Sequence, residues 1–169
     1  MSKDISRNLT TTDKYFLMVC IDLAEEALRA GDKPFGSILV NKAGNVLAQA
    51  RNKINTLNAL AHPEYELAEW ALNNLTKEQR QKCTMYTSGE HCPMCAGAHG
   101  MSEIGTVVYA ATGEQLSEWL QELDVSSPLI NLIPIENVVK NIIVRGPAKG
   151  ELLERIKNLH IRLHTQNKK

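Results

Sequence analysis

Residues 83–111, CTMYTSGEHCPMCAGAHGMSEIGTVVYAA, predict a strand, a helix and a second strand in direct succession. Residues 83–87 and 104–111 contain the β-branched and aromatic residues typical of strands. Residues 93–101 lie between them and predict a short helix that begins with a proline. Strands joined through a helix usually lie parallel in one sheet. This unit therefore predicts a protein of the α/β class.

The segments on either side extend the same pattern. Residues 12–30 carry apolar side chains at helical spacing, and residues 35–40 and 46–50 are two apolar runs around a Gly-Asn turn, typical of a hairpin. The expected order is completed by helices at residues 63–75, 114–123 and 151–164 and by a strand at residues 141–144. We expect an α/β fold, namely a three-layer α/β/α sandwich with a central mixed five-stranded sheet, in one domain over residues 1–169.

The composition is that of a globular protein without net charge. Nineteen Lys and Arg residues balance nineteen Asp and Glu residues, which disfavours a general binder of polyanions. No apolar run reaches the roughly 18–20 residues that a membrane span needs, and the polar N-terminus has no stretch like that of a secretory signal. We therefore expect a cytoplasmic protein with no membrane partner, in which the four cysteines form no disulfide framework.

Two short segments carry potential metal ligands. Cys92 and Cys95 are three residues apart, and His62 precedes Cys92 by thirty residues. One imidazole and two thiolates are three ligands that suit zinc, and they leave a fourth position open for water, which is the pattern of a catalytic site. A C-x-x-C pair alone is equally typical of a redox pair or of half a structural site, so His62 decides the interpretation.

The prolines that follow these ligands support the same interpretation. Pro63 and Pro93 each stand at the predicted first position of a helix, which places His62 and Cys92 at two helix N-termini. The positive end of a helix dipole favours a thiolate. Glu64 falls on the apolar side of its helix, where an inward carboxylate beside a metal-bound water can move protons as a general base and acid.

The combination of His62-Pro63-Glu64 with Cys92-Pro93-Met94-Cys95 resembles the H-x-E and P-C-x-x-C signature of the zinc-dependent cytidine and nucleobase deaminases. Within this group the chain is most similar to the branch of guanine deaminases and tRNA adenosine deaminases, and the C-x-x-C spacing with the Ala96-Gly97-Ala98 sequence after it is the specific part of the resemblance. The resemblance implies one Zn²⁺ per chain with a bound water or hydroxide. It also implies that Glu64 removes a proton from this water, and then protonates a ring nitrogen and the departing ammonia.

The resemblance also implies substrate contacts. Asn52 matches the family asparagine that contacts the base or the ribose. Phe35 and Ala61 are expected to line the substrate pocket. Ser88 lies in the matching loop. His91 stands where the family usually has a proline, and it is expected at the rim of the site or behind the metal ligands. Gly89 stands where guanine deaminases usually carry a bulkier residue.

Several functions remain open on this sequence. A deaminase of a small nucleobase or nucleoside is favoured, with a guanine-type purine first. The alternatives are a tRNA-editing adenosine deaminase, a deaminase of another heterocycle such as cytosine, a pterin or a triazine, and a non-catalytic zinc module. Residues 113–139 carry five acids, which argues against RNA and makes nucleic acid an unexpected partner. A homodimer is expected from the family habit, with the apolar residues 128–135 as a candidate interface or lid.

The remaining histidines and cysteines have simpler expected roles. His99 is expected to be a satisfied polar residue in its helix. His160 and His164 are expected to face solvent or a partner. Cys20 and Cys83 are expected in the core.

Overall fold

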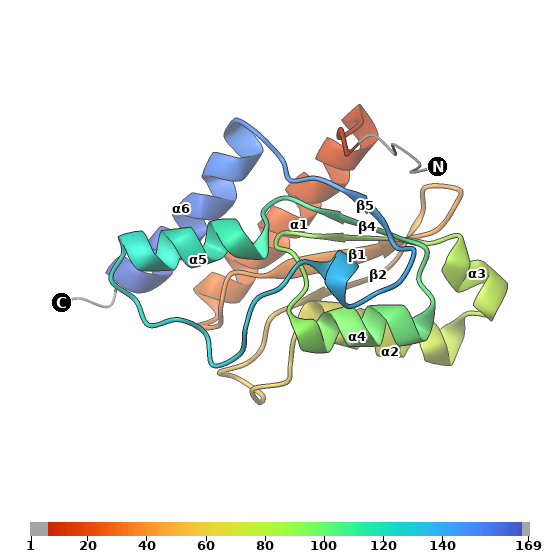
Figure 1. Ribbon diagram of the computed structural model, residues 1–169, viewed down its shortest axis with the longest axis horizontal. Helices are drawn as coiled ribbons and strands as arrows, with labels where there is room; N and C mark the ends of the chain where they lie inside the picture. Colours follow the sequence, from red (N-terminus) through yellow and green to blue (C-terminus); the bar gives the residue numbers. More distant parts are fainter. Residues whose placement is uncertain (1–6, 167–169) are drawn as a thin grey trace.

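One mixed sheet organises the computed structural model, which describes residues 7–166. Its strands lie in the order β2-β1-β3-β4-β5 (Figure 1). Strand β1 pairs antiparallel with both β2 and β3, whereas β3, β4 and β5 are parallel. The predicted five-stranded mixed sheet is therefore confirmed. The strand bounds are β1 (Gly36–Val40), β2 (Val46–Arg51), β3 (Thr84–Thr87), β4 (Thr106–Tyr109) and β5 (Ile143–Arg145).

Helices cover both faces of the sheet, as the sequence predicts. Three of them pack on one face and two on the other (Figure 1). The first group is α1 (Thr11–Arg29), α5 (Gly113–Glu122) and α6 (Glu151–Thr165), and the second is α2 (Pro63–Asn74) and α4 (Pro93–Ser102). No helix within residues 7–166 is both long and apolar enough to cross a membrane.

Alternation along the strands divides the core between the two faces. Ile38 and Val40 belong to the core under α1 and α6, whereas Leu39 belongs to the core under α2. In the same way Tyr86 faces α1 and Met85 faces α2. Because β1 contacts helices on both faces, all five of its residues are buried.

Gly36 allows α1 to lie directly on β1. A Cβ atom at this position would stand 2.4 Å from the carbonyl oxygen of Cys20 and 2.5 Å from Cβ of Leu23. Both atoms belong to α1, and the carbonyl oxygen is backbone that cannot move aside. The closeness of this helix to the strand therefore requires glycine.

The structure departs from the sequence prediction at a few places. A short helix α3 (Lys77–Gln81) and a 3-10 turn η1 (Ile135–Asn137) were not expected, because elements of five and three residues carry no measurable periodicity. The expectation that His160 faces solvent or a partner is wrong. Its side chain is buried four residues after Ile156 on the apolar face of α6, against the rings of Phe35 and Trp119.

A partly buried ion pair joins α1 to the last strand of the sheet. Both oxygens of Asp13 on α1 accept hydrogen bonds from Arg145 on β5, at 2.8 and 2.9 Å, and the Tyr86 hydroxyl donates a third at 2.9 Å. Burial opposes ionisation of Asp13. The hydrogen bonds from Arg145, from the Thr10 N–H and from Tyr86 outweigh this effect and hold the pKa of Asp13 below its usual value.

We expect the Asp13→Ala variant to lose about 3–5 kcal/mol of unfolding free energy at pH 7, because it leaves Arg145 partly buried without its partner. Urea denaturation measures this loss. The matched control Asp22→Ala removes an exposed acid that pairs with Arg155, and its cost should stay below about 1 kcal/mol. Because the native pKa of Asp13 is depressed, its contribution is complete above the unfolded pKa of about 3.9 and is lost as pH falls through the native pKa. A variant as stable as the wild type at pH 7 would contradict the argument.

Candidate active site

The three predicted metal ligands meet at one point in the structure. The Nδ1 atom of His62 lies 3.7 Å from Sγ of Cys92 and 3.6 Å from Sγ of Cys95. All three ligand atoms lie within 4.8 Å of one another. A tetrahedral zinc with Zn–N and Zn–S bonds of ordinary length places its nitrogen and sulfur ligands about 3.5 Å apart. The spacing and the donor types therefore fit a zinc ion.

Two helix starts build this cluster. His62 is the N-cap of α2 and Cys92 the N-cap of α4, each followed by a proline at the first helical position. Neither side chain caps its own helix, so both are available as ligands. Cys95 lies one turn into α4 and is fully buried. Because α2 and α4 pack against each other, the two helix N-termini bring their ligands together.

The charges of the cluster suit a metal site. A hydrogen bond from the Cys95 thiol, together with the neighbouring His62, holds the pKa of Cys92 well below its usual value. The pKa of Cys95 is raised, because its thiol is the donor in this pair and is also buried. The hydrogen bond with Cys92 raises the pKa of His62. One thiolate is therefore already stabilised by its surroundings, as metal binding requires.

Glu64 points inward, as the sequence predicts. Its side chain is 4% exposed, and its Oε1 accepts a hydrogen bond of 2.7 Å from the Thr87 hydroxyl. The Ser37 hydroxyl lies 3.3 Å from the same oxygen and 2.9 Å from Oγ1 of Thr87. Burial raises the pKa of Glu64, and the hydrogen bond from Thr87 opposes this rise. The carboxyl group is thus held in one place by two strands.

Thr87 can hydrogen-bond to Glu64 in either protonation state of the Glu64 carboxyl group. Its Oγ1 lies 3.0 Å from the carbonyl oxygen of Gly89 as well as 2.7 Å from Glu64. When Glu64 is ionised, the hydroxyl donates to it. When Glu64 is protonated, the hydroxyl accepts from it and donates to Gly89. The sequence prediction does not include Ser37 or Thr87 among the site residues. A polar residue inside an otherwise apolar strand, such as Ser37, is a signal that could have pointed to a role in the site.

Backbone hydrogen bonds connect the predicted substrate contacts. The Asn52 N–H donates to the Phe35 carbonyl at 3.0 Å, and the Lys53 N–H donates to the Ala61 carbonyl at 3.0 Å. Ser88 is buried, and its hydroxyl accepts a hydrogen bond of 3.1 Å from the Gly36 N–H. Phe35, Asn52 and Ser88 therefore surround Gly36, next to the residues that hold Glu64. Their contact with a substrate stays a prediction.

Gly89 and Phe35 are direct neighbours. A Cβ atom at Gly89 would stand 3.1 Å from Cε1 of the Phe35 ring. The same ring also packs against His160 at a centroid distance of 5.1 Å. Glycine at position 89 therefore makes room for the phenylalanine ring, which explains why a bulkier residue is absent.

His91 is buried, which favours a place behind the metal ligands over one at the rim of the site, and its contact with a substrate stays a prediction. Its side chain is 3% exposed, and Nε2 lies 3.1 Å from Nδ1 of His99. Nε2 of His99 in turn lies 3.1 Å from the Ile104 carbonyl, which can only accept. His99 therefore carries its proton on Nε2, and His91 donates to His99. Burial lowers the pKa of His91, and lowers that of His99 to about 4, so both rings are neutral.

Glu90, which lies between β3 and Cys92, anchors the C-terminal third of the chain to this segment. Its two oxygens accept hydrogen bonds from the N–H groups of Gly113 and Ile135, at 2.9 and 3.0 Å. Of the apolar segment 128–135, Ile135 is buried, whereas Leu129, Ile130 and Ile133 are exposed. No sequence pattern marks Glu90 for this role, because its partners are backbone N–H groups far along the chain.

Comparison with known proteins identifies the class to which this site belongs. The family model and the curated relatives place the fold and the site in the cytidine deaminase superfamily, whose deaminases depend on zinc. The model of the MafB19-like deaminase family matches residues 11–146. The chain belongs to this family, and it is a hydrolytic deaminase that cleaves a C–N bond.

Curated relatives act on different bases. A probable cytosine deaminase of Schizosaccharomyces pombe is 32% identical over 126 residues, which cover 73% of this chain and 75% of the relative. The guanine deaminase of Bacillus subtilis is 37% identical over 105 residues, which cover 61% and 67%. The tRNA-specific adenosine deaminase of the same organism is 33% identical over 102 residues, which cover 60% and 63%. The predicted resemblance to this group is therefore confirmed.

A solved structure shows the same fold. The guanine deaminase from Nitrosomonas europaea superposes with a TM-score of 0.65 over 93% of this chain and 86% of that one. Their sequences are 18% identical, so the likeness concerns the fold alone. The expected cytidine deaminase-like sandwich is confirmed by it.

Proposed function

We propose that this chain is a zinc enzyme that deaminates a free aminated nucleobase or its nucleoside and releases ammonia, with a guanine-type purine as the favoured substrate. The observation that carries the proposal is the buried Glu64 carboxylate, two residues from His62 and held by Thr87. A structural zinc module has no need of an inward acid at this position. The active site belongs to one deaminase domain over residues 1–169, and the working form is a homodimer.

His62, Cys92 and Cys95 would hold one Zn²⁺ per chain. The ion supplies a Lewis acid that makes water a nucleophile at neutral pH. The two thiolates neutralise its double charge. Within residues 7–166 only these three side chains offer ligand atoms to the cluster, so a coordination position is left for solvent and substrate.

Glu64 carries the protons of the reaction. It accepts one from the attacking water and delivers it to the ring nitrogen next to the carbon that bears the amine. It then carries the second proton of the water to the departing amine, so that one water and one amine become one carbonyl and one ammonia. Thr87 keeps the carboxyl group in place through both states.

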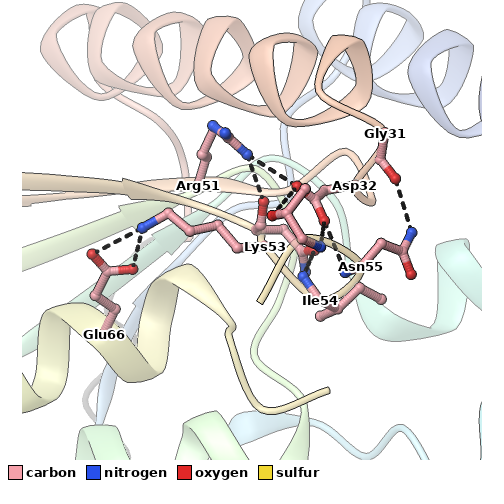
Figure 2. A network of polar contacts seen from close by, with 9 residues as sticks. Gly31, Asp32, Arg51, Lys53, Ile54, Asn55 and Glu66 are labelled. Atoms are coloured by element: carbon pink, nitrogen blue, oxygen red, sulfur yellow. Dashed lines mark hydrogen bonds and ion pairs between the residues drawn. The ribbon is translucent and has the colours of Figure 1, made fainter. Parts of the chain in front are cut away.

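The surroundings of the pocket favour a small substrate over RNA. Arg51 and Lys53 flank Asn52, but Arg51 pairs with buried Asp32 and Lys53 with Glu66 (Figure 2). Cations that are already paired attract phosphates weakly. The guanine deaminase of Bacillus subtilis, at 37% identity, supports a purine. Cytosine is the second candidate, because the probable cytosine deaminase matches the largest share of this chain among the three relatives.

Ammonia release against a panel tests the proposal. The panel contains guanine, adenine, cytosine, their nucleosides, an aminopterin, an aminotriazine and a tRNA anticodon stem-loop, and the protein is assayed after its zinc is quantified. We expect turnover of one free base or nucleoside. Turnover of the stem-loop alone would replace the proposal by the tRNA-editing alternative. No turnover of any panel member by protein that holds one zinc per chain would overturn the proposed substrates and leave a ring outside the panel or the non-catalytic zinc module.

A further inference from the structure

Asp32 is an acid with no contact to solvent. It lies between α1 and β1, its side chain is 0% exposed, and a buried carboxylate is costly unless it is fully hydrogen-bonded. Here it is. Oδ1 accepts from the N–H groups of Asn55 at 2.8 Å and Thr56 at 3.0 Å, and Oδ2 accepts from the Thr56 hydroxyl at 2.9 Å and from Arg51 at 3.2 Å (Figure 2).

The donors all come from one stretch of chain. Arg51 ends β2, and Asn55 and Thr56 lie in the loop that leads from β2 to His62. Two further bonds strengthen the connection. The Asn55 side chain donates to the Gly31 carbonyl at 2.9 Å, and Nη1 of Arg51 also donates to the Asn52 carbonyl at 3.1 Å. Asp32 therefore fastens the start of this loop to the end of α1.

Two predicted substrate contacts stand directly beside this junction. Phe35 follows Asp32 by three residues, and Asn52 follows Arg51 by one. The Asn52 N–H bonds to the Phe35 carbonyl at 3.0 Å, so the two positions are also linked to each other. The Asn52 side chain has its oxygen engaged with the Ile54 N–H at 3.0 Å, which orients the amide NH₂ as the group offered to a ligand. Displacement of either segment would move both contacts.

We propose that Asp32 is a positioning residue for the substrate pocket: acting through Arg51 and the N–H groups of Asn55 and Thr56, it fixes Asn52 relative to Phe35. The inference rests on the proposed function, because it concerns how the substrate is bound. It assigns Asp32 to binding and leaves the proton transfers to Glu64. A residue that only stabilised the fold would change unfolding without a selective change in substrate affinity.

The test compares Asp32→Asn and Arg51→Met with the control Glu66→Gln, which breaks the exposed ion pair between Lys53 of the same loop and Glu66 on α2. For each zinc-loaded variant kcat and KM are measured on guanine, or on cytosine if the wild type prefers it. The dissociation constant of that base is also measured in a Glu64→Ala background, which gives a reading without turnover. We expect KM and the dissociation constant to rise about tenfold in both variants, kcat to change less than about threefold, and the control to match the wild type.

Two further variants test whether Asp32 acts through Arg51 and whether the effect on binding is independent of folding. Because Asp32 and Arg51 act through the same contact, Asp32→Asn with Arg51→Met should cost little more than either change alone. If Asp32→Asn does not fold, Thr56→Val removes a single hydroxyl donor and should raise KM about threefold. Unchanged KM, or loss of kcat without a change in affinity, would overturn the inference. A wild-type enzyme that turns over no base would instead overturn the proposed function.

Discussion

The Glu64→Gln variant should lose about 10²–10⁴-fold in kcat while it keeps one zinc per chain. Glutamine has the same shape and can still accept the hydrogen bond from Thr87, so the pocket should keep its geometry. Its amide is neither an acid nor a base near neutral pH, so neither proton transfer of the deamination can proceed through it. Ammonia release under saturating substrate measures the loss, and zinc content is measured on the same sample.

A matched control for this variant lies two residues further along the chain. Glu66 stands in the same first turn of α2, but its carboxylate is 48% exposed and pairs with Lys53. The Glu66→Gln variant should keep kcat within about twofold of the wild type, because an exposed pair contributes little. A Glu64→Gln enzyme with wild-type kcat would remove Glu64 from the mechanism.

Loss of a thiolate ligand should have the second large effect. Cys92→Ser and Cys95→Ser each leave two strong ligands where the site needs three, so we expect less than one bound zinc per chain and no measurable turnover. Because a metal bound only by the folded state stabilises that state, both variants should also unfold at a lower temperature than the zinc-loaded wild type. Metal analysis and calorimetry on the same samples measure both quantities.

The chain supplies a control cysteine of its own. Cys83 is buried in the core under α2, away from the cluster, so Cys83→Ala should keep one zinc per chain and full turnover, whatever it costs in stability. Chelation of the wild type should abolish turnover, and added zinc should restore it. If Cys92→Ser retained both zinc and turnover, the three-ligand site would be wrong.

Much of the candidate site could be predicted because its chemistry is local. His62, Glu64, Cys92 and Cys95 sit at helix starts that are marked by prolines, and each position follows from a short run of sequence. The helices α1 and α6 follow from apolar side chains at helical spacing, and the hairpin of β1 and β2 follows from two apolar runs around a Gly-Asn turn.

The residues that escaped prediction act through partners distant in sequence. Asp32 accepts from the backbone N–H of Asn55, 23 residues away, and Glu90 accepts from that of Ile135, 45 residues away. No side-chain pattern marks a backbone donor, so neither contact could be found in the sequence. His91 was expected at the rim of the site or behind the metal ligands because the next residue is a predicted ligand. Its ring turns toward His99 on α4, an arrangement that depends on helix packing.

The pairing of Asp13 with Arg145 limits when the chain can fold during its synthesis. The two residues are 132 positions apart, and the N-terminal helix emerges first from the ribosome. Until Arg145 has emerged, the acid on α1 lacks the partner that makes its burial favourable, and β5 cannot yet close the edge of the sheet beside β4. The nascent chain therefore cannot reach its final packing before Arg145 has left the ribosome, and until then α1 lacks part of the sheet and of the core that cover it.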